Sequence, residues 1–156
     1  MKRDEIIKYC DSIIHSNTFA LSKPRLYEKI IESYWIKRDK NYGTVLIVTS
    51  DMDNTYDNIH KAIVTYMDMD IMNIRKTNVE IVMDCLIGNQ EKIMIIIKKD
   101  YNIGMSVRGM RADLVILDAV DDIINIKEDN DIKSLICITS MNQSDSVDRL
   151  IMIYDR

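Results

Sequence analysis

Proline and glycine are scarce in this sequence, with one proline and four glycines among 156 residues. Disordered chains are enriched in both residue types, so their scarcity argues against disorder and against a glycine-rich binding loop. Apolar residues make up 47% and charged residues 29%, which is the composition of a folded globular protein. A chain of this length builds one core more readily than two, so we expect a single domain over residues 1–156.

Cysteine and histidine are also few and far apart. The three cysteines, Cys10, Cys85 and Cys137, each lie in or beside an apolar stretch, and their number is odd. This pattern favours buried free thiols over disulfides. Neither His15 nor His60 is spaced from a cysteine as zinc ligands are, so the sequence gives no support for a zinc site.

Long apolar runs are missing as well. The first residues are charged and lack the apolar core of a signal peptide, and no segment reaches membrane-spanning length. We therefore expect an intracellular protein in a reducing compartment, without a membrane contact. The net charge of −4 means that nucleic acid would bind only through a local basic patch. Lys98, Lys99, Arg108 and Arg111 form one candidate patch, and a solvated charged loop is the alternative explanation.

Helical and strand patterns alternate along the chain. Gly88-Asn89 separates two apolar runs and predicts a hairpin, residues 68–78 are polar and predict a connection, and residues 150–154 predict an edge strand. The alternation predicts a three-layer α/β/α sandwich with a mostly parallel sheet. The pattern predicts helices over residues 4–14, 27–36, 55–67 and 120–126, and strands over residues 18–21, 44–49, 79–87, 91–97, 114–118 and 135–139.

An acidic residue, Asp118, ends the apolar run 114–117. Open α/β sheets bind ligands at the carboxyl ends of their strands, and P-loop ATPases hold Mg²⁺ there with an Asp. A second carboxylate usually follows and orients the attacking water, but here the next residue is Ala119. Asp51 and Asp53 follow the strand 44–49 and could join Asp118 in a metal cluster, although capping of the next helix is the simpler role.

No intact phosphate-binding motif stands where a phosphate loop is expected. Lys29 lies where a phosphate-binding lysine would be, but Glu28 replaces the glycine and Ile30 replaces the metal-binding Ser or Thr. By spacing alone, this segment is better explained as a helix N-terminus with surface charges. Farther along, the strand 135–139 leads to Ser140, whose hydroxyl can contact a phosphate or cap a helix.

The order of these segments resembles the ATPase domain of the large terminase subunit, which packages DNA in tailed phages and herpesviruses. The strongest part is VRGMRADLVILDAVDDI, residues 107–123, which is similar to the (I/V)RG turn and Walker B strand of that family. Pro24-Arg25 and Glu28-Lys29-Ile30 stand where the family has an arginine and a Gly-Lys-Thr. LICITSMN, residues 135–142, is similar to the family's coupling segment. The resemblance spans about residues 18–142 and implies a P-loop-NTPase-like fold.

The resemblance also implies roles for single residues, with ATP and Mg²⁺ as the cofactors. Arg25 would lie near the γ-phosphate, Lys29 on the phosphates and Asp118 on Mg²⁺. The family has a catalytic Glu where this chain has Ala119. Losing such a carboxylate lowers the rate by roughly 10²-fold or more. The 156 residues hold no segment for the family's nuclease domain, which we therefore expect to be absent.

These departures lead to the hypothesis of a viral, terminase-like pseudo-ATPase that binds or scaffolds in the nucleus or cytoplasm of an infected host cell. We expect it to bind a protein partner, or a second copy of itself through residues 150–154. DNA is a further candidate partner. The alternative is a weak ATPase of viral DNA packaging that a partner completes in trans. An unrelated α/β protein is the third hypothesis. Both terminase hypotheses fail if residues 114–117 form an edge strand, or if Lys29 and Asp118 lie on opposite sides of the sheet.

Overall fold

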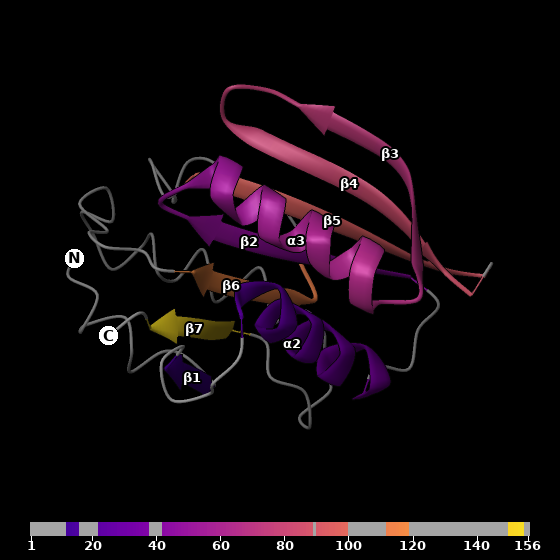
Figure 1. Cartoon of the computed structure of the whole chain (residues 1–156), viewed down its shortest axis with the longest axis horizontal. Coiled ribbons are helices and arrows are strands. Elements are labelled where there is room, and N and C mark those ends of the chain that lie inside the picture. The colour runs from indigo at the N-terminus through magenta and orange to yellow at the C-terminus, as the bar shows by residue number, and fades with distance from the viewer. Residues whose placement is uncertain are drawn as a thin grey trace.

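Within the described residues, the computed structural model of the protein contains one seven-stranded sheet and two helices (Figure 1). The structure describes residues 12–15, 22–37, 42–88, 90–99, 112–118 and 150–154. The mixed α/β class predicted from the sequence is confirmed. No helix in these ranges is long and apolar enough to cross a membrane. The elements are β1 (Ser12–His15), α2 (Lys23–Lys37), β2 (Tyr42–Thr49), α3 (Met52–Tyr66), β3 (Met69–Lys76), β4 (Glu80–Ile87), β5 (Glu91–Lys99), β6 (Leu114–Asp118) and β7 (Leu150–Tyr154).

The strands lie in the order β1-β7-β6-β2-β5-β4-β3. The pairs β1–β7, β7–β6, β6–β2 and β2–β5 are parallel, whereas β5–β4 and β4–β3 are antiparallel. The sheet is therefore mixed. On the side that ends in β3, its antiparallel pairs depart from the mostly parallel sheet that we predicted. Strand β6 is an interior strand, so the terminase hypotheses do not fail on the condition that residues 114–117 would form an edge strand. The prediction that residues 150–154 form an edge strand is wrong, because β7 lies between β1 and β6.

Two further predicted elements need correction, and a third begins earlier than expected. Residues 12–14, predicted as helical, belong to β1, where pairing with β7 outweighs the local helical spacing. Residues 69–76, predicted as a connection, form β3, a largely exposed strand whose apolar residues lose strict alternation at the register shift between Ile71 and Asn73. Helix α2 begins at Lys23 rather than at Tyr27, because Pro24 in a first turn removes no helical hydrogen bond.

The hairpin predicted at Gly88 is confirmed. Strands β4 and β5 pair antiparallel on either side of it, and Gly88 has a φ of 56°. A residue without a Cβ adopts this left-handed conformation at little cost, which explains the choice of glycine at the turn. The predicted strands 18–21 and 135–139 and the predicted helix 120–126 lie outside the described residues.

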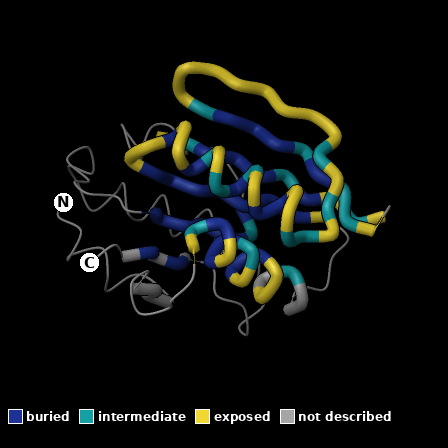
Figure 2. The backbone as a smooth tube through the Cα atoms, in the orientation of Figure 1, coloured by how far each residue is buried: buried dark blue, intermediate teal, exposed yellow. Residues whose placement is uncertain are grey.

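The main hydrophobic core lies between the two helices and one face of the sheet (Figure 2). In α2 the buried side chains Leu26, Tyr27, Ile30 and Ile31 recur at the spacing of one helical face. Burial of one such side chain stabilises the fold by about 1.5–3 kcal/mol. The members of this core from α3 and the sheet are Met52, Ile59, Ala62, Ile63, Val45, Ile47, Ile81, Met83, Cys85, Ile93, Ile95, Ile97, Leu114, Ile116, Ile151 and Ile153.

The central strand β2 is buried on both of its faces. Side chains alternate along a strand, so Val45 and Ile47 face the helices while Leu46 and Val48 point to the opposite side. All four have an exposed fraction of 0%. Both described helices lie in front of the sheet in Figure 1, so the described residues show two layers. The third layer of the predicted sandwich stays a prediction.

Candidate functional site

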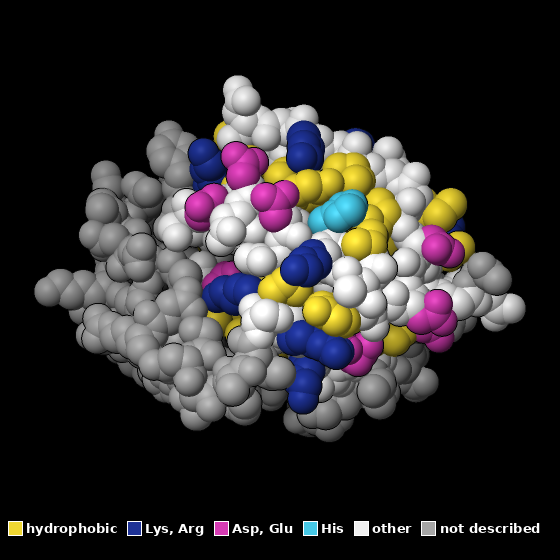
Figure 3. Space-filling model, viewed as in Figure 1, with side chains coloured by type: hydrophobic (Ala, Val, Ile, Leu, Met, Phe, Trp, Pro, Cys, Tyr) yellow, Lys and Arg dark blue, Asp and Glu magenta, His cyan; other side chains and the backbone are white. Residues whose placement is uncertain are grey.

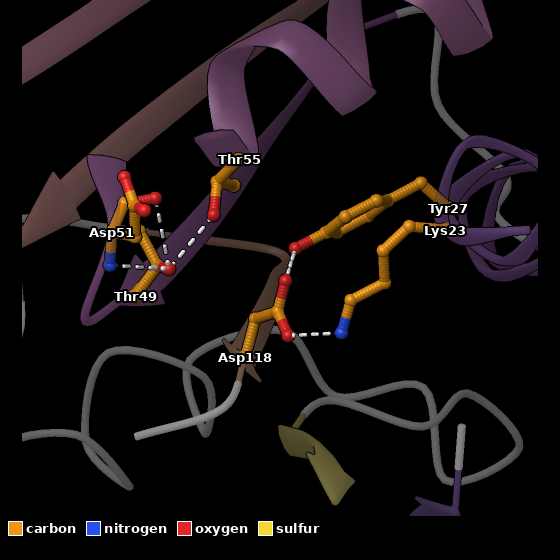
Figure 4. A network of polar contacts seen from close by, with 6 residues as sticks. All are labelled: Lys23, Tyr27, Thr49, Asp51, Thr55 and Asp118. Atoms are coloured by element: carbon orange, nitrogen blue, oxygen red, sulfur yellow. Dashed lines mark hydrogen bonds and ion pairs between the residues drawn. The ribbon is translucent and has the colours of Figure 1, made fainter. Parts of the chain in front are cut away.

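Asp118 lies at the end of β6, where the parallel neighbour β2 also ends. Thr49, the last residue of β2, is the register partner of Asp118. Helix α3 begins three residues after Thr49, and Lys23 at the start of α2 reaches the same edge of the sheet (Figure 4). The N-termini of two helices therefore converge beside Asp118. Their partial positive charge stabilises a carboxylate at this edge.

Both carboxylate oxygens of Asp118 have partners on α2 (Figure 4). The Lys23 ammonium donates to Oδ1 at 2.7 Å, and the Tyr27 hydroxyl donates to Oδ2. Lys23 and Tyr27 are four residues apart, so they project from one face of the helix. Asp118 is only 3% exposed, and a buried carboxylate without a cation carries a large free-energy penalty. The ammonium of Lys23 offsets this penalty.

A second polar cluster joins the end of β2 to the start of α3. The hydroxyls of Thr49 and Thr55 lie 2.7 Å apart, and both side chains are buried. The amide of Asp51 donates to the Thr49 hydroxyl at 3.2 Å. The Asp51 side chain accepts from the amide of Asn54 at 3.1 Å, so Asp51 is the N-cap of α3, the simpler of the two roles that the sequence left open for it.

The described residues contain no group of three or more His, Cys, Asp or Glu side chains that could hold a metal ion. Asp51 and Asp53 are exposed, and Asp51 serves α3 as its cap. The metal cluster that we considered for these residues and Asp118 is therefore absent from the part of the chain that the structure describes.

The lysine at Asp118 is not the one that the sequence singled out. Lys29 is exposed and lies six residues beyond Lys23 on α2. If Lys29 were the phosphate-binding lysine, Ile30 would stand in the place of the metal-binding Ser or Thr. In the structure, Ile30 is buried in the hydrophobic core. Lys23 and Tyr27 were both missed by the sequence reasoning, although the structure brings them to Asp118.

Arg25 has surface partners on both helices. Its Nη1 lies 2.9 Å from Glu28 Oε2, and its guanidinium carbon lies 3.9 Å from the centre of the Tyr66 ring. The hydrogen bond that Arg25 donates to Glu28 raises the pKa of Arg25, and the charge of Glu28 adds to this effect. The contact with Tyr66 connects α2 to α3, whereas Glu28 lies on α2 itself.

The basic patch proposed around Lys98 divides in the structure. Lys98 and Lys99 are consecutive on β5, so their side chains point to opposite faces of the sheet. Lys98 is largely buried and lies 3.2 Å from Glu80 Oε2, whereas Lys99 is exposed. Arg108 and Arg111, together with Ala119 and Ser140, lie outside the described residues.

A signal in the sequence does point to Lys23. Residues 17–24, NTFALSKP, have the spacing of the phosphate-binding loop G-x-x-x-x-G-K-[ST], with Lys23 at the position of the lysine. Asn17 and Ser22 occupy the two glycine positions, and Pro24 occupies the Ser/Thr position. Because three of the four defining residues are changed, this motif is recognisable only once Lys23 is seen beside Asp118.

No protein-family model matches the sequence, and no curated protein matches it. The structure of the large terminase from a thermophilic bacteriophage is similar over 94% of this chain, with a TM-score of 0.56 and 7% sequence identity. The same terminase in complex with ATP-gamma-S gives a TM-score of 0.47 and 8% identity. The chain spans 33% of the length of these terminases. At such low identity the first comparison shows a shared fold, and it confirms the terminase-like fold that the sequence resemblance implied.

Proposed function

We propose that this chain is a terminase-like pseudo-ATPase, which keeps a P-loop-type fold and acts as a binding module without hydrolysing ATP. The observation that carries the proposal is the pairing of Asp118 with Lys23 and Tyr27. In a P-loop ATPase, the acid at this strand end holds Mg²⁺ and the lysine holds phosphate. Here the two side chains neutralise each other, and the carboxylate is buried.

The residues around Asp118 do not fit a Mg²⁺ ion. Magnesium prefers hard oxygen ligands in an octahedral arrangement. Pro24 offers no hydroxyl where the motif has Ser or Thr, and Ala119 offers no carboxylate where the family has Glu. A metal at Asp118 would also displace the ammonium of Lys23 from its contact at 2.7 Å. These substitutions support a site that has lost the means to activate water.

The proposed fold is a three-layer sandwich of the P-loop type. Its support comes from β2 and β6, whose side chains opposite the described helices are as buried as those that face them. Leu46, Val48, Val115 and Leu117 all have an exposed fraction of 0%. Strands that are apolar on both faces are typical of sheets covered on both sides.

The relationship to a DNA-packaging terminase suggests that the partner of this module is a component of viral DNA packaging. A protein partner or a second copy remains our proposal, whereas pairing through the edge of β7 is excluded by its interior position. DNA is a less favoured partner, since Lys98 and Lys99 point to opposite faces of the sheet. A salt titration of DNA binding tests it, because phosphate contacts weaken steeply with salt.

A sensitive phosphate-release assay tests the loss of hydrolysis. We expect no Mg²⁺-dependent turnover above that of the Asp118→Asn variant, and no rise in melting temperature with ATP and Mg²⁺. Lys29→Ala is the matched control for Lys23→Ala, because both lysines lie on α2 but only Lys23 contacts Asp118. Turnover that survives in Lys29→Ala and disappears in Lys23→Ala would contradict the proposal.

One observation favours an alternative, a weak ATPase that a partner completes. Lys23 begins a helix beside a strand-end acid, which is the arrangement that a phosphate-binding lysine requires. A partner could supply the missing carboxylate or an arginine in trans. Reconstitution with capsid and portal components discriminates the two functions: turnover that depends both on the partner and on Lys23 supports the alternative.

A further inference from the structure

A hollow of about 250 Å³ lies at the end of α2 that is far from Lys23 and Asp118. Its walls come from the second half of α2, the segment that follows α3, the start of β3 and the end of β4. The lining residues are Ile31, Glu32, Trp35, Met67, Asp68, Met69 and Ile87. The hollow is therefore distinct from the Asp118 site, and what binds there does not depend on the fate of nucleotide at Asp118.

The walls of the hollow are apolar and partly preformed. Trp35 donates its indole N–H to Glu91 Oε2, which fixes the plane of the ring. Met67 and Met69 are half-buried beside it and pack against the core. Methionine side chains are flexible and polarizable, so they adapt to apolar groups of different shape. An apolar cavity of roughly 150 Å³ accepts benzene, so this hollow has room for one large apolar side chain.

The rim of the hollow is acidic. Glu32 on α2 and Asp68 after α3 are both at the surface, and the lining residues include no lysine or arginine. Figure 3 shows acidic and hydrophobic side chains next to each other near the ends of α2 and α3. Two carboxylates beside an apolar hollow complement a group that carries an apolar body and a positive charge.

We propose that this hollow is the docking site for a protein segment that inserts one large apolar side chain and places flanking lysine or arginine residues against Glu32 and Asp68. Anchors of this kind provide most of the binding free energy at an interface, while charges at the rim set specificity and the association rate. The proposal rests on the proposed function of the chain as a binding module and extends it by naming the surface and the chemistry of the partner.

The test uses the full chain and short capped peptides with a central Leu, Met or Phe between two lysines on each side, compared with the same anchors between glutamates. Trp35 is the only tryptophan of the sequence, so its fluorescence reports directly on the hollow. Methyl signals of Met67 and Met69 in NMR spectra give a second, independent readout. We expect the lysine-flanked peptides to bind roughly fivefold more tightly or better, as two exposed ion pairs would give.

Charge reversal at the rim provides the decisive variant. Glu32→Lys with Asp68→Lys leaves the core intact, because both side chains lie at the surface, and it should reverse the preference toward glutamate-flanked peptides. Asp57→Lys on α3 is the matched control and should keep the original preference, because Asp57 does not line the hollow.

The proposal is overturned if millimolar peptide changes neither readout, or if the rim variant keeps the preference for lysine. Binding of phenethylammonium as tight as that of the peptides would also overturn it, by assigning the hollow to a small organic cation. Neither result depends on ATP turnover, so failure here is distinguishable from failure of the pseudo-ATPase proposal.

Discussion

Replacement of Lys23 by methionine is the most informative perturbation of this protein. The change keeps a long side chain at position 23 of α2 but leaves the carboxylate of Asp118 without its cation. The Asp118 side chain is only 4% exposed, while that of Lys23 is 22% exposed. Removing one partner of a buried ion pair typically costs about 3–5 kcal/mol. Because water reaches part of Lys23, we expect the lower end, about 3 kcal/mol of unfolding free energy.

A double-mutant cycle separates the ion pair from other effects of each change. Asp118→Asn keeps the shape of the side chain and removes its charge, so it should cost about 2 kcal/mol through the weakened contacts of Lys23 and Tyr27. The double variant Lys23→Met with Asp118→Asn no longer buries an unpaired carboxylate. It should therefore be more stable than the sum of the single changes predicts, by about 2 kcal/mol.

Urea denaturation followed through the fluorescence of Trp35 measures these free energies. In a chain of this size, 1 kcal/mol shifts the melting temperature by about 2–4 °C, so Lys23→Met should lower it by about 6–12 °C. Lys29→Met is the control, because this exposed lysine lies on the same helix and should change stability by less than about 0.5 kcal/mol. Equal effects of the two substitutions, or a gain in stability in Asp118→Asn, would refute the structural role of the pair.

Three further outcomes follow from the described contacts. Thr49→Val should cost about 1–3 kcal/mol, because it leaves the buried hydroxyl of Thr55 without its partner, and adding Thr55→Val should recover most of this loss in urea denaturation. Asp51→Ala should cost about 1 kcal/mol as the loss of an N-cap, and an equal loss in the exposed Asp57→Ala control would contradict the capping role. Burial, reinforced by the charge of Asp84, raises the pKa of the Cys85 thiol from 9.0 to about 12. The stability that comes from keeping this buried thiol neutral is therefore complete below pH 9 and is lost as the pH rises toward 12. Peptide mapping should accordingly find Cys85 unalkylated by iodoacetamide in the native protein at neutral pH and alkylated after denaturation.

Elements with a strong local pattern were predictable from the sequence, and those that depend on distant partners were not. The buried strands β2 and β6 are runs of consecutive apolar residues, and the hairpin at Gly88 has its own turn signal, so each was identified correctly. Strand β3 is largely exposed and lacks strict apolar alternation, and it forms through its pairing with β4. Strand β1 forms through its pairing with β7, from the far end of the chain.

The candidate site shows the same division. Asp118 was identified because an acid at the end of an apolar strand is visible in any α/β sequence. Its partners could not be identified in this way, because Lys23 and Tyr27 are separated from it by 95 and 91 residues. The choice of Lys29 followed from spacing to its neighbours, which says nothing about the direction in which a helical side chain points. Lys29 is exposed, whereas Lys23, six residues earlier on α2, reaches Asp118 at the end of β6.

The sequence by itself determined the mixed α/β class, the central strands and the strand-end position of Asp118, because these depend on the apolar character of neighbouring residues. The tertiary structure alone decided that β7 is an interior strand, that a lysine and a tyrosine from α2 contact Asp118, and that Trp35 lines an acidic-rimmed hollow. The physical reason is that these features arise where segments far apart in the chain meet. Their contacts are set by the packing of α2 and α3 on the sheet and by strand pairing, and local periodicity does not encode either.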